Sequence, residues 1–332
     1  MDGGLVQTNE AQSGTYSVDT LIREALSELK AGHANEVIPL LESALRIDCE
    51  DIETLYALKC INWWLEKLAT LEGITTHYDK GYFIMGQWGA FYAFLETIGP
   101  HFDRCRYAVQ HFVYGTALES FEAVLDDGVL RHDPGLLLRI GRCYKGVGNF
   151  EAAQNYLMDA ARFRQEDGAA LAELADVNAL MGEIKNAKVL FREAFFVDPQ
   201  GIDVNVLESE MITGLVKTVR EAGINGGALV EWIPVYGALL GVFSVKRELK
   251  LVELGKLNQA VFALENKVRT NSDDRDLCLP RLLNHLIWLL DYYERANEDP
   301  NKIQELQLKI KIYDPAIYYR FIHIKEDPGK KL

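Results

Sequence analysis

The chain repeats itself with a period of 34 residues, and this repetition limits its fold more than any other feature. The stretches 134–167 and 168–201 align without a gap, so that Leu137 matches Leu171. The other matched pairs are Ile140 with Leu174, Gly141 with Ala175, Gly148 with Gly182, Ala153 with Ala187, Leu157 with Phe191 and Ala160 with Ala194. Repeats of this length indicate small supersecondary units that bury their apolar faces against neighbouring copies.

Each copy has the pattern of two helices joined by a turn. Small residues at Gly141 and Ala153 let two helix backbones approach closely, and the larger matched residues fill the space between helices. Gly148 and Gly182 are placed to end the first helix of each copy, because glycine takes the left-handed conformation without strain. Pro199 stops the second helix of the second copy.

The two copies resemble the tetratricopeptide repeat, whose signature is W-x₂-L-G-x₂-Y…A-x₃-F…P. The first copy matches it at Leu137, Ile140, Gly141, Tyr144, Ala153, Leu157 and Ala160. The second copy matches it at Leu171, Leu174, Ala175, Ala187, Phe191, Ala194 and Pro199. Leucine replaces the tryptophan in both copies, Asn178 replaces the tyrosine in the second, and Gln165 replaces the proline in the first. The resemblance implies an all-α, right-handed superhelical solenoid of stacked antiparallel helix pairs.

Weaker copies extend this array over residues 17–201, after a flexible leader at 1–16 that lacks the features of a signal peptide. Residues 19–51 have a turn glycine at Gly32. Residues 52–99 are predicted to be one repeat with lengthened helices, joined by the polar loop ITTHYDK. Residues 100–128 are predicted to be a further helix pair that turns at Gly115.

The array is predicted to continue less regularly towards the C-terminus, to roughly seven or eight helical pairs in all. Residues 202–240 fit the repeat worst and are predicted to form an irregular helical pair. Residues 241–315 are predicted to hold divergent pairs, one of them with its turn at Gly255. Residues 316–332 are predicted to form a capping helix and tail.

The stretch 226–245 is the most apolar in the chain and is about as long as the ~20 residues that span a bilayer. Glu231 and Pro234 interrupt it, and Gly237 and Gly241 lower its helix propensity. We therefore predict a buried helix within the solenoid, with contact to a membrane as the alternative.

Composition excludes several functions. The formal charge is −14, from 49 acidic and 35 basic residues, and a surface this negative repels nucleic acid. The five cysteines and seven histidines show no metal-ligand spacing, and no nucleophile-elbow, phosphate-loop or zinc-protease motif occurs. We therefore expect a non-enzymatic cytoplasmic protein without metal or cofactor.

The resemblance also implies which residues line the concave groove of the solenoid, because certain positions of each first helix face it. These positions hold aromatic residues in the N-terminal half and charged residues beyond it: Tyr56, Trp63, Trp64, Phe102, Phe112, Arg142, Lys145 and Asp176. Residues 63–121 contain 14 of the 34 aromatic residues of the chain. Aromatic residues and arginine dominate protein-binding hot spots, although aromatic residues also fill helical cores efficiently.

These features predict a protein–protein interaction scaffold or adaptor that holds a partner helix or extended segment in an aromatic-lined groove. The set of lysines and asparagines with which co-chaperone repeats hold a C-terminal carboxylate is incomplete here, which disfavours that function. The alternative is a structural subunit of a larger assembly, such as a bacterial envelope or flagellar-motor complex. It would use its outer surface and the apolar segment 226–245.

Overall fold

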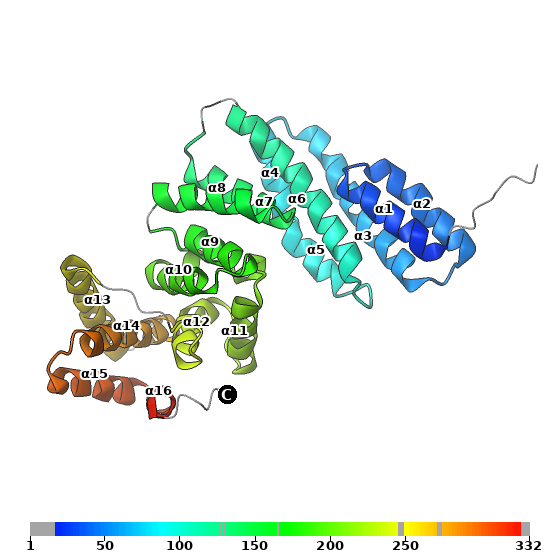
Figure 1. The fold of residues 1–332 in the computed structure, drawn as a ribbon. Helices are drawn as coiled ribbons and strands as arrows, with labels where there is room; N and C mark the ends of the chain where they lie inside the picture. The colour runs from blue at the N-terminus through cyan, green and yellow to red at the C-terminus, as the bar shows by residue number, and fades with distance from the viewer. Residues whose placement is uncertain are drawn as a thin grey trace, which may run out of the picture. The chain divides into compact units, whose positions relative to one another are not determined.

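The computed structural model describes residues 17–126, 128, 130–164, 166–244, 249–270 and 274–326. Across these ranges the chain is helical and contains no β-strand, which confirms the predicted all-α class (Figure 1). The chain divides into two compact units, residues 1–129 with 146–148 and residues 130–145 with 149–332. The leader predicted at 1–16 lies outside the described residues.

The helices of the first unit are α1 (Val18–Lys30), α2 (Ala34–Ile47), α3 (Ile52–Ala69), the 3₁₀ turn η1 (Thr70–Gly73), α4 (His77–Gly86), α5 (Trp88–Leu95) and α6 (Asp103–Asp126). The second unit begins with α7 (Pro134–Gly146), α8 (Phe150–Phe163), α9 (Gly168–Leu180) and α10 (Ile184–Val197). It continues with η2 (Pro199–Gly201), η3 (Val204–Val206), α11 (Glu210–Glu221), α12 (Gly227–Leu239), α13 (Leu251–Arg269), α14 (Arg275–Arg295), α15 (Pro300–Tyr313) and α16 (Pro315–Glu326).

The two clearest copies of the repeat fold as the helix pairs α7–α8 and α9–α10. Gly141 on α7 lies so close to α8 that a Cβ atom on it would be 2.6 Å from Cγ of Leu157. The matched small residues expose no surface: Ala153, Ala160, Ala175, Ala187 and Ala194. Gly148 and Gly182 have φ values of +80° and +84°, so the turns predicted at these glycines are confirmed.

Helices α1 and α2 pack against each other in the same manner. Gly32 between them has a φ of +88°, so the turn predicted at this glycine is confirmed. Val37, Leu41 and Ala44 on α2 expose no surface. Helix α1 begins after Ser17, whose hydroxyl accepts a hydrogen bond from the backbone N–H of Thr20 at 3.2 Å.

The prediction of a helix pair at 100–128 is wrong, because residues Asp103–Asp126 form the single helix α6. Gly115 lies inside α6 without ending it. One interior glycine costs only about 1 kcal/mol, and the completely buried Ala117 and Phe121 in the following turns offset that cost. Helix α4 packs along α6 (Figure 1). A Cβ atom on Gly81 of α4 would lie 2.7 Å from the Phe121 ring.

The repeat predicted at 52–99 also departs from its expected form. Helix α3 is long, as predicted, but the expected loop ITTHYDK already contains the start of α4. The reason is a cap: the Thr76 hydroxyl accepts a hydrogen bond from the backbone N–H of Asp79 at 3.0 Å. The second half of the predicted repeat is broken at Gln87 into α4 and α5, and the main partner of α4 is α6.

The apolar stretch 226–245 contains α12, and the prediction of a buried helix is confirmed. Ile233 and Val235 expose no surface, and Leu239 exposes 3%. No helix in the described part of the chain is both long and apolar enough to cross a bilayer. Within the irregular pair predicted at 202–240, the first helix is α11, which begins only at Glu210 after the turn η3.

The prediction of a turn at Gly255 is wrong, because this glycine lies inside helix α13. The helix runs without a break from Leu251 to Arg269, and Gly255 is exposed within it. The following elements occur as separate helices in contact, α14 with α15 and α15 with α16. Helix α16 occupies the segment in which a capping helix is predicted; residues 327–332 lie outside the described ranges.

His285 in α14 makes the core of the second unit sensitive to acid. It stacks on Phe196 of α10 with 5.1 Å between ring centroids, and burial lowers its pKa to about 4 from 6.5. The unfolded chain therefore binds the proton more tightly, so stability is lost as pH falls from 6.5 through 4. Between pH 7 and pH 5 this histidine should cost the native state about 2 kcal/mol. Urea unfolding of wild type and of His285→Leu at both pH values measures this loss of unfolding free energy. Equal losses in the two proteins would contradict the prediction.

Candidate functional site

Three residues predicted to face the groove, Arg142, Lys145 and Asp176, lie together in a charge cluster on α7 and α9. Lys145 Nζ donates hydrogen bonds to Glu173 Oε2 at 2.5 Å and to Asp176 Oδ2 at 2.9 Å. Arg142 Nε donates to the other Glu173 oxygen, Oε1, at 2.5 Å. Lys145, Glu173 and Asp176 expose 3%, 1% and 0% of their surface, so the centre of the cluster is closed to solvent.

The connection between α10 and α11 covers this cluster with its own backbone. Lys145 Nζ donates a third hydrogen bond to the carbonyl of Val206 at 2.8 Å. The backbone N–H groups of Glu208 and Ser209 donate to the two oxygens of Asp176 at 2.9 and 2.8 Å. Apolar side chains of the same connection are buried in the core of the second unit: Ile202, Val204 and Leu207. The chain thus fills, around Lys145 and Asp176, the face on which a partner was predicted.

The electrostatics of Lys145 suit a structural role. Burial by itself lowers the pKa of this amine, but the charges of Glu173 and Asp176 outweigh it and hold the pKa above its ordinary value. An ammonium group has three donors, and Glu173, Asp176 and Val206 use all three. Such a group keeps its proton at neutral pH, so Lys145 is neither a general base nor a nucleophile.

The predicted aromatic residues of α3 are mostly part of the core. Tyr56 and Trp64 expose only 2% and 1%. Residues of α6 lie against Tyr56, and the rings of Trp88 and Phe91 on α5 lie against Trp64. Tyr56 lies 5.4 Å from Phe102, and Trp64 lies 5.3 Å from Phe91, both measured between ring centroids. Trp63 is half-buried. Burial leaves Tyr56 and Trp64 almost no surface for a partner.

The other two predicted aromatic residues differ in exposure. Phe112 on α6 is buried, whereas Phe102, just before α6, is half-buried. The face of α3 that does meet solvent is one residue out of phase with the predicted one and comprises Ile52, Leu55, Lys59, Asn62 and Glu66. Of the predicted set in the first unit, Trp63 and Phe102 therefore retain accessible surface.

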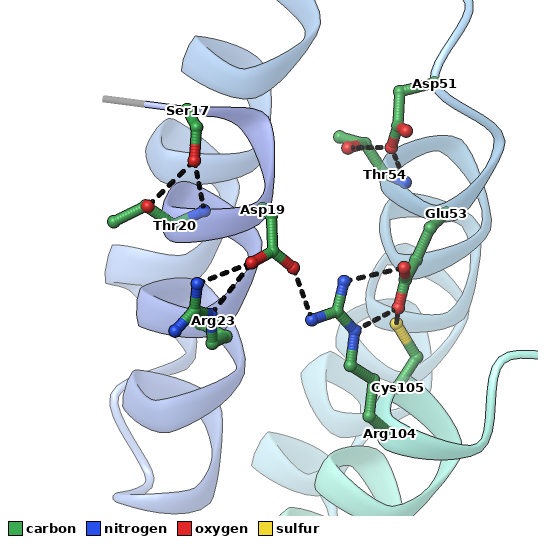
Figure 2. Close-up of polar contacts among 9 residues, drawn as sticks. All are labelled: Ser17, Asp19, Thr20, Arg23, Asp51, Glu53, Thr54, Arg104 and Cys105. Carbon is green, nitrogen blue, oxygen red and sulfur yellow. Dashed lines mark hydrogen bonds and ion pairs between the residues drawn. The ribbon is translucent and has the colours of Figure 1, made fainter. Parts of the chain in front are cut away.

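An ion network that was not predicted from the sequence ties three helices of the first unit together (Figure 2). Arg104 of α6 donates to both carboxylate oxygens of Glu53 on α3, at 2.5 and 2.7 Å. Its third hydrogen bond goes to Asp19 Oδ1 on α1 at 2.7 Å, while Arg23 holds the other oxygen of Asp19. Hydrogen bonds from Arg104 and then Arg23 lower the pKa of Asp19.

One part of this network had a sequence signal. Asp19 and Glu53 are 34 residues apart, so they occupy the same position in successive repeats, in the first helical turn. Their shared partner Arg104 lies 51 residues beyond Glu53, and no spacing rule connects them. The three half-buried or exposed side chains hold the helix ends in place.

The buried charge inside the apolar helix α12, Glu231, is also paired. Glu231 exposes 1% of its surface, and Arg281 of α14 binds it through two hydrogen bonds, one of them from Nε to Oε2 at 3.0 Å. Gln200 Nε2 donates to the same carboxylate at 2.8 Å. A buried charge that is paired and hydrogen-bonded in this way is tolerated in a protein core.

Neither a metal centre nor a known family emerges from these residues. Among the described residues, no three His, Cys, Asp or Glu side chains are grouped so that they could hold a metal ion. In comparisons with known proteins, no family model and no curated protein matches the chain.

Proposed function

We propose that this chain is a non-enzymatic scaffold of the tetratricopeptide class, a right-handed superhelical solenoid that holds a helix or extended segment of a partner protein. The observation that carries the proposal is the matched packing of α7–α8 and α9–α10, with Gly141 against Leu157 and left-handed glycines at both turns. Helix α8 in turn packs against α9, as stacked repeats require. We expect a cytoplasmic protein with no cofactor and no nucleic-acid partner.

Exposure decides which predicted residues contact the partner. In the first unit we assign this role to Trp63 and Phe102, which retain accessible surface. In the second unit Arg142 keeps 21% of its side chain exposed and is oriented by Glu173. The buried residues Tyr56, Trp64, Phe112, Lys145 and Asp176 support these contacts from within the fold. Partly exposed aromatic residues and arginine on a rigid support are typical of binding hot spots.

Site-specific photocrosslinking in the native cell tests this assignment. A photoreactive phenylalanine derivative at position 63 should yield a covalent adduct with a distinct protein, because Trp63 is placed at the interface. The matched control is the same substitution at Tyr82, an aromatic residue of the same unit with 56% exposure that lies outside the predicted groove. Adducts that form equally from both positions, or from position 82 alone, would move the interface away from Trp63.

A second candidate function is that of a structural subunit in a larger assembly. The specific observation in its favour is a set of large apolar side chains that are more than half exposed on both units, among them Ile47, Ile52, Leu308, Ile312 and Tyr319. The apolar segment 226–245 does not serve this role in the predicted way, because the apolar side chains of α12 are mostly buried in the core.

A further inference from the structure

Charge is distributed very unevenly along this chain. Residues 1–129 contain 20 acidic and 8 basic residues, whereas residues 130–332 contain 29 acidic and 27 basic residues. Within the second part, residues 241–332 carry 14 acidic and 16 basic residues and are slightly positive. The net negative charge of the protein therefore belongs almost entirely to its first unit.

The first unit has an exposed apolar surface within this acidic field, which we call the N-face. Ile47 ends α2, and Ile52 and Leu55 lie one turn apart on the solvent side of α3; they are 56%, 58% and 38% exposed. The short connection between the two helices contains three further acidic residues, Asp48, Glu50 and Asp51. Apolar side chains grouped on a surface and surrounded by charge mark a protein-binding site.

The second unit has an apolar surface of opposite charge near its C-terminal end, which we call the C-face. Leu308 and Ile312 lie one turn apart on α15 and are 56% and 68% exposed. Lys311, between them, extends over the ring of Tyr319 on α16, with its Nζ 5.4 Å from the ring centroid. Tyr319 is itself 52% exposed, and Arg320 beside it is also exposed.

We infer that the occupant of the N-face is the C-face of a second copy of this chain, so that copies associate head to tail. This inference rests on the second proposed function, that of a structural subunit. Acidic residues outnumber basic ones around the N-face, where Asp48, Glu50 and Asp51 lie near Arg46 and Lys59, and basic residues outnumber acidic ones around the C-face, where Lys311 and Arg320 lie near Glu305. The excess charges are opposite in sign, as are the net charges of residues 1–129 and 241–332, so unlike faces attract each other more than like faces do. A contact between two different surfaces does not close on a two-fold axis and builds chains of copies.

Sedimentation of the full-length protein tests the inference through two double variants. Ile52→Ser with Leu55→Ser removes the N-face, and Leu308→Ser with Ile312→Ser removes the C-face; all four side chains are exposed, and circular dichroism verifies folding. Wild type should grow beyond a dimer as its concentration rises to about 100 μM, a range suited to a small, weak interface. Each variant alone should remain monomeric. An equimolar mixture should form dimers and stop there, because only one intact contact can form.

Salt and a surface control complete the design. Raising NaCl from about 50 to 500 mM should weaken wild-type association roughly tenfold, because salt screens the complementary charges. Met158→Ser, which alters another apolar side chain with 54% exposure, should associate like wild type. A wild-type chain that stays monomeric, or single-face variants that associate as wild type does, would overturn the inference. Such a result leaves the structural-subunit function standing if affinity purification still recovers the chain in an assembly with other proteins, so the inference and the function on which it rests fail separately.

Discussion

Replacing Lys145 by methionine is expected to lower the free energy of unfolding by about 3–5 kcal/mol, the usual cost of breaking a buried ion pair by removing one partner. The change leaves Glu173 and Asp176 facing each other with almost no access to water, and it also removes the donor to the Val206 carbonyl. Methionine matches the length of the lysine stem, so the loss reports the charge and its hydrogen bonds. Urea unfolding monitored by circular dichroism measures the difference.

Two further variants separate this charge effect from packing. Arg142→Met should cost less, about 1–2 kcal/mol, because Arg142 is partly exposed and Lys145 still pairs with Glu173. Glu173→Gln should cost less in the Lys145→Met background than in wild type, since it then removes an uncompensated charge. A coupling of more than about 1 kcal/mol is expected for such neighbours. If Lys145→Met cost under 1 kcal/mol and showed no coupling, the closed charge cluster would not exist in solution.

Replacing Gly168 by alanine is expected to cost about 3 kcal/mol, at the upper end of the usual cost of overpacking. A Cβ atom on Gly168, at the start of α9, would lie 2.2 Å from the carbonyl oxygen of Asp198 and 3.1 Å from that of Ala194. Both neighbours are backbone atoms at the end of α10, so no side-chain rotation can relieve the clash. The two helices must move apart at the site where they cross.

Gly214→Ala is the matched control for this prediction. Gly214 lies inside α11, and a Cβ atom on it would meet nothing within 4 Å. The same added methyl group should therefore raise stability by about 0.5–1 kcal/mol, because alanine restricts the unfolded chain and favours helix. Thermal unfolding of both variants checks the two signs. Equal and small effects at positions 168 and 214 would contradict the close packing of α9 on α10.

The fold of the two clear repeats could be predicted from the sequence because its determinants are local. A glycine after a helix, a small residue where backbones touch and a proline after the next helix each have one dominant physical meaning, as at Gly182, Gly141 and Pro199. Burial of α12 was also predictable from local residues, because a charged residue (Glu231) and a proline (Pro234) are unfavourable in a lipid-exposed helix.

Helix continuity was harder to predict, because a glycine can either end a helix or lie inside one. Gly115 and Gly255 match the turn position of the repeat, yet both lie inside helices. Whether such a glycine ends a helix depends on what the residues after it can bury. For Gly115 those residues include Ala117 and Phe121, whose burial requires the helix to continue.

The candidate site was predictable only in part, because exposure depends on segments distant in sequence. The repeat pattern brings Arg142, Lys145 and Asp176 together on neighbouring helices, as the structure shows. It does not reveal that the connection at 202–209 covers Lys145 and Asp176, nor that α5 and α6 cover Tyr56 and Trp64. A lysine in the sequence also gives no sign that it is buried.

The measurement that tests the central claim most directly is affinity purification of the tagged wild-type chain from its native cell, with bound proteins identified and quantified by mass spectrometry. The comparison is the Trp63→Ala, Phe102→Ala double variant, first shown by circular dichroism to be folded. A scaffold should retain one or a few proteins in amounts comparable to its own, and the variant should lose them at least tenfold. A wild-type chain that retains no protein in such amounts would contradict the claim that it functions by holding a partner.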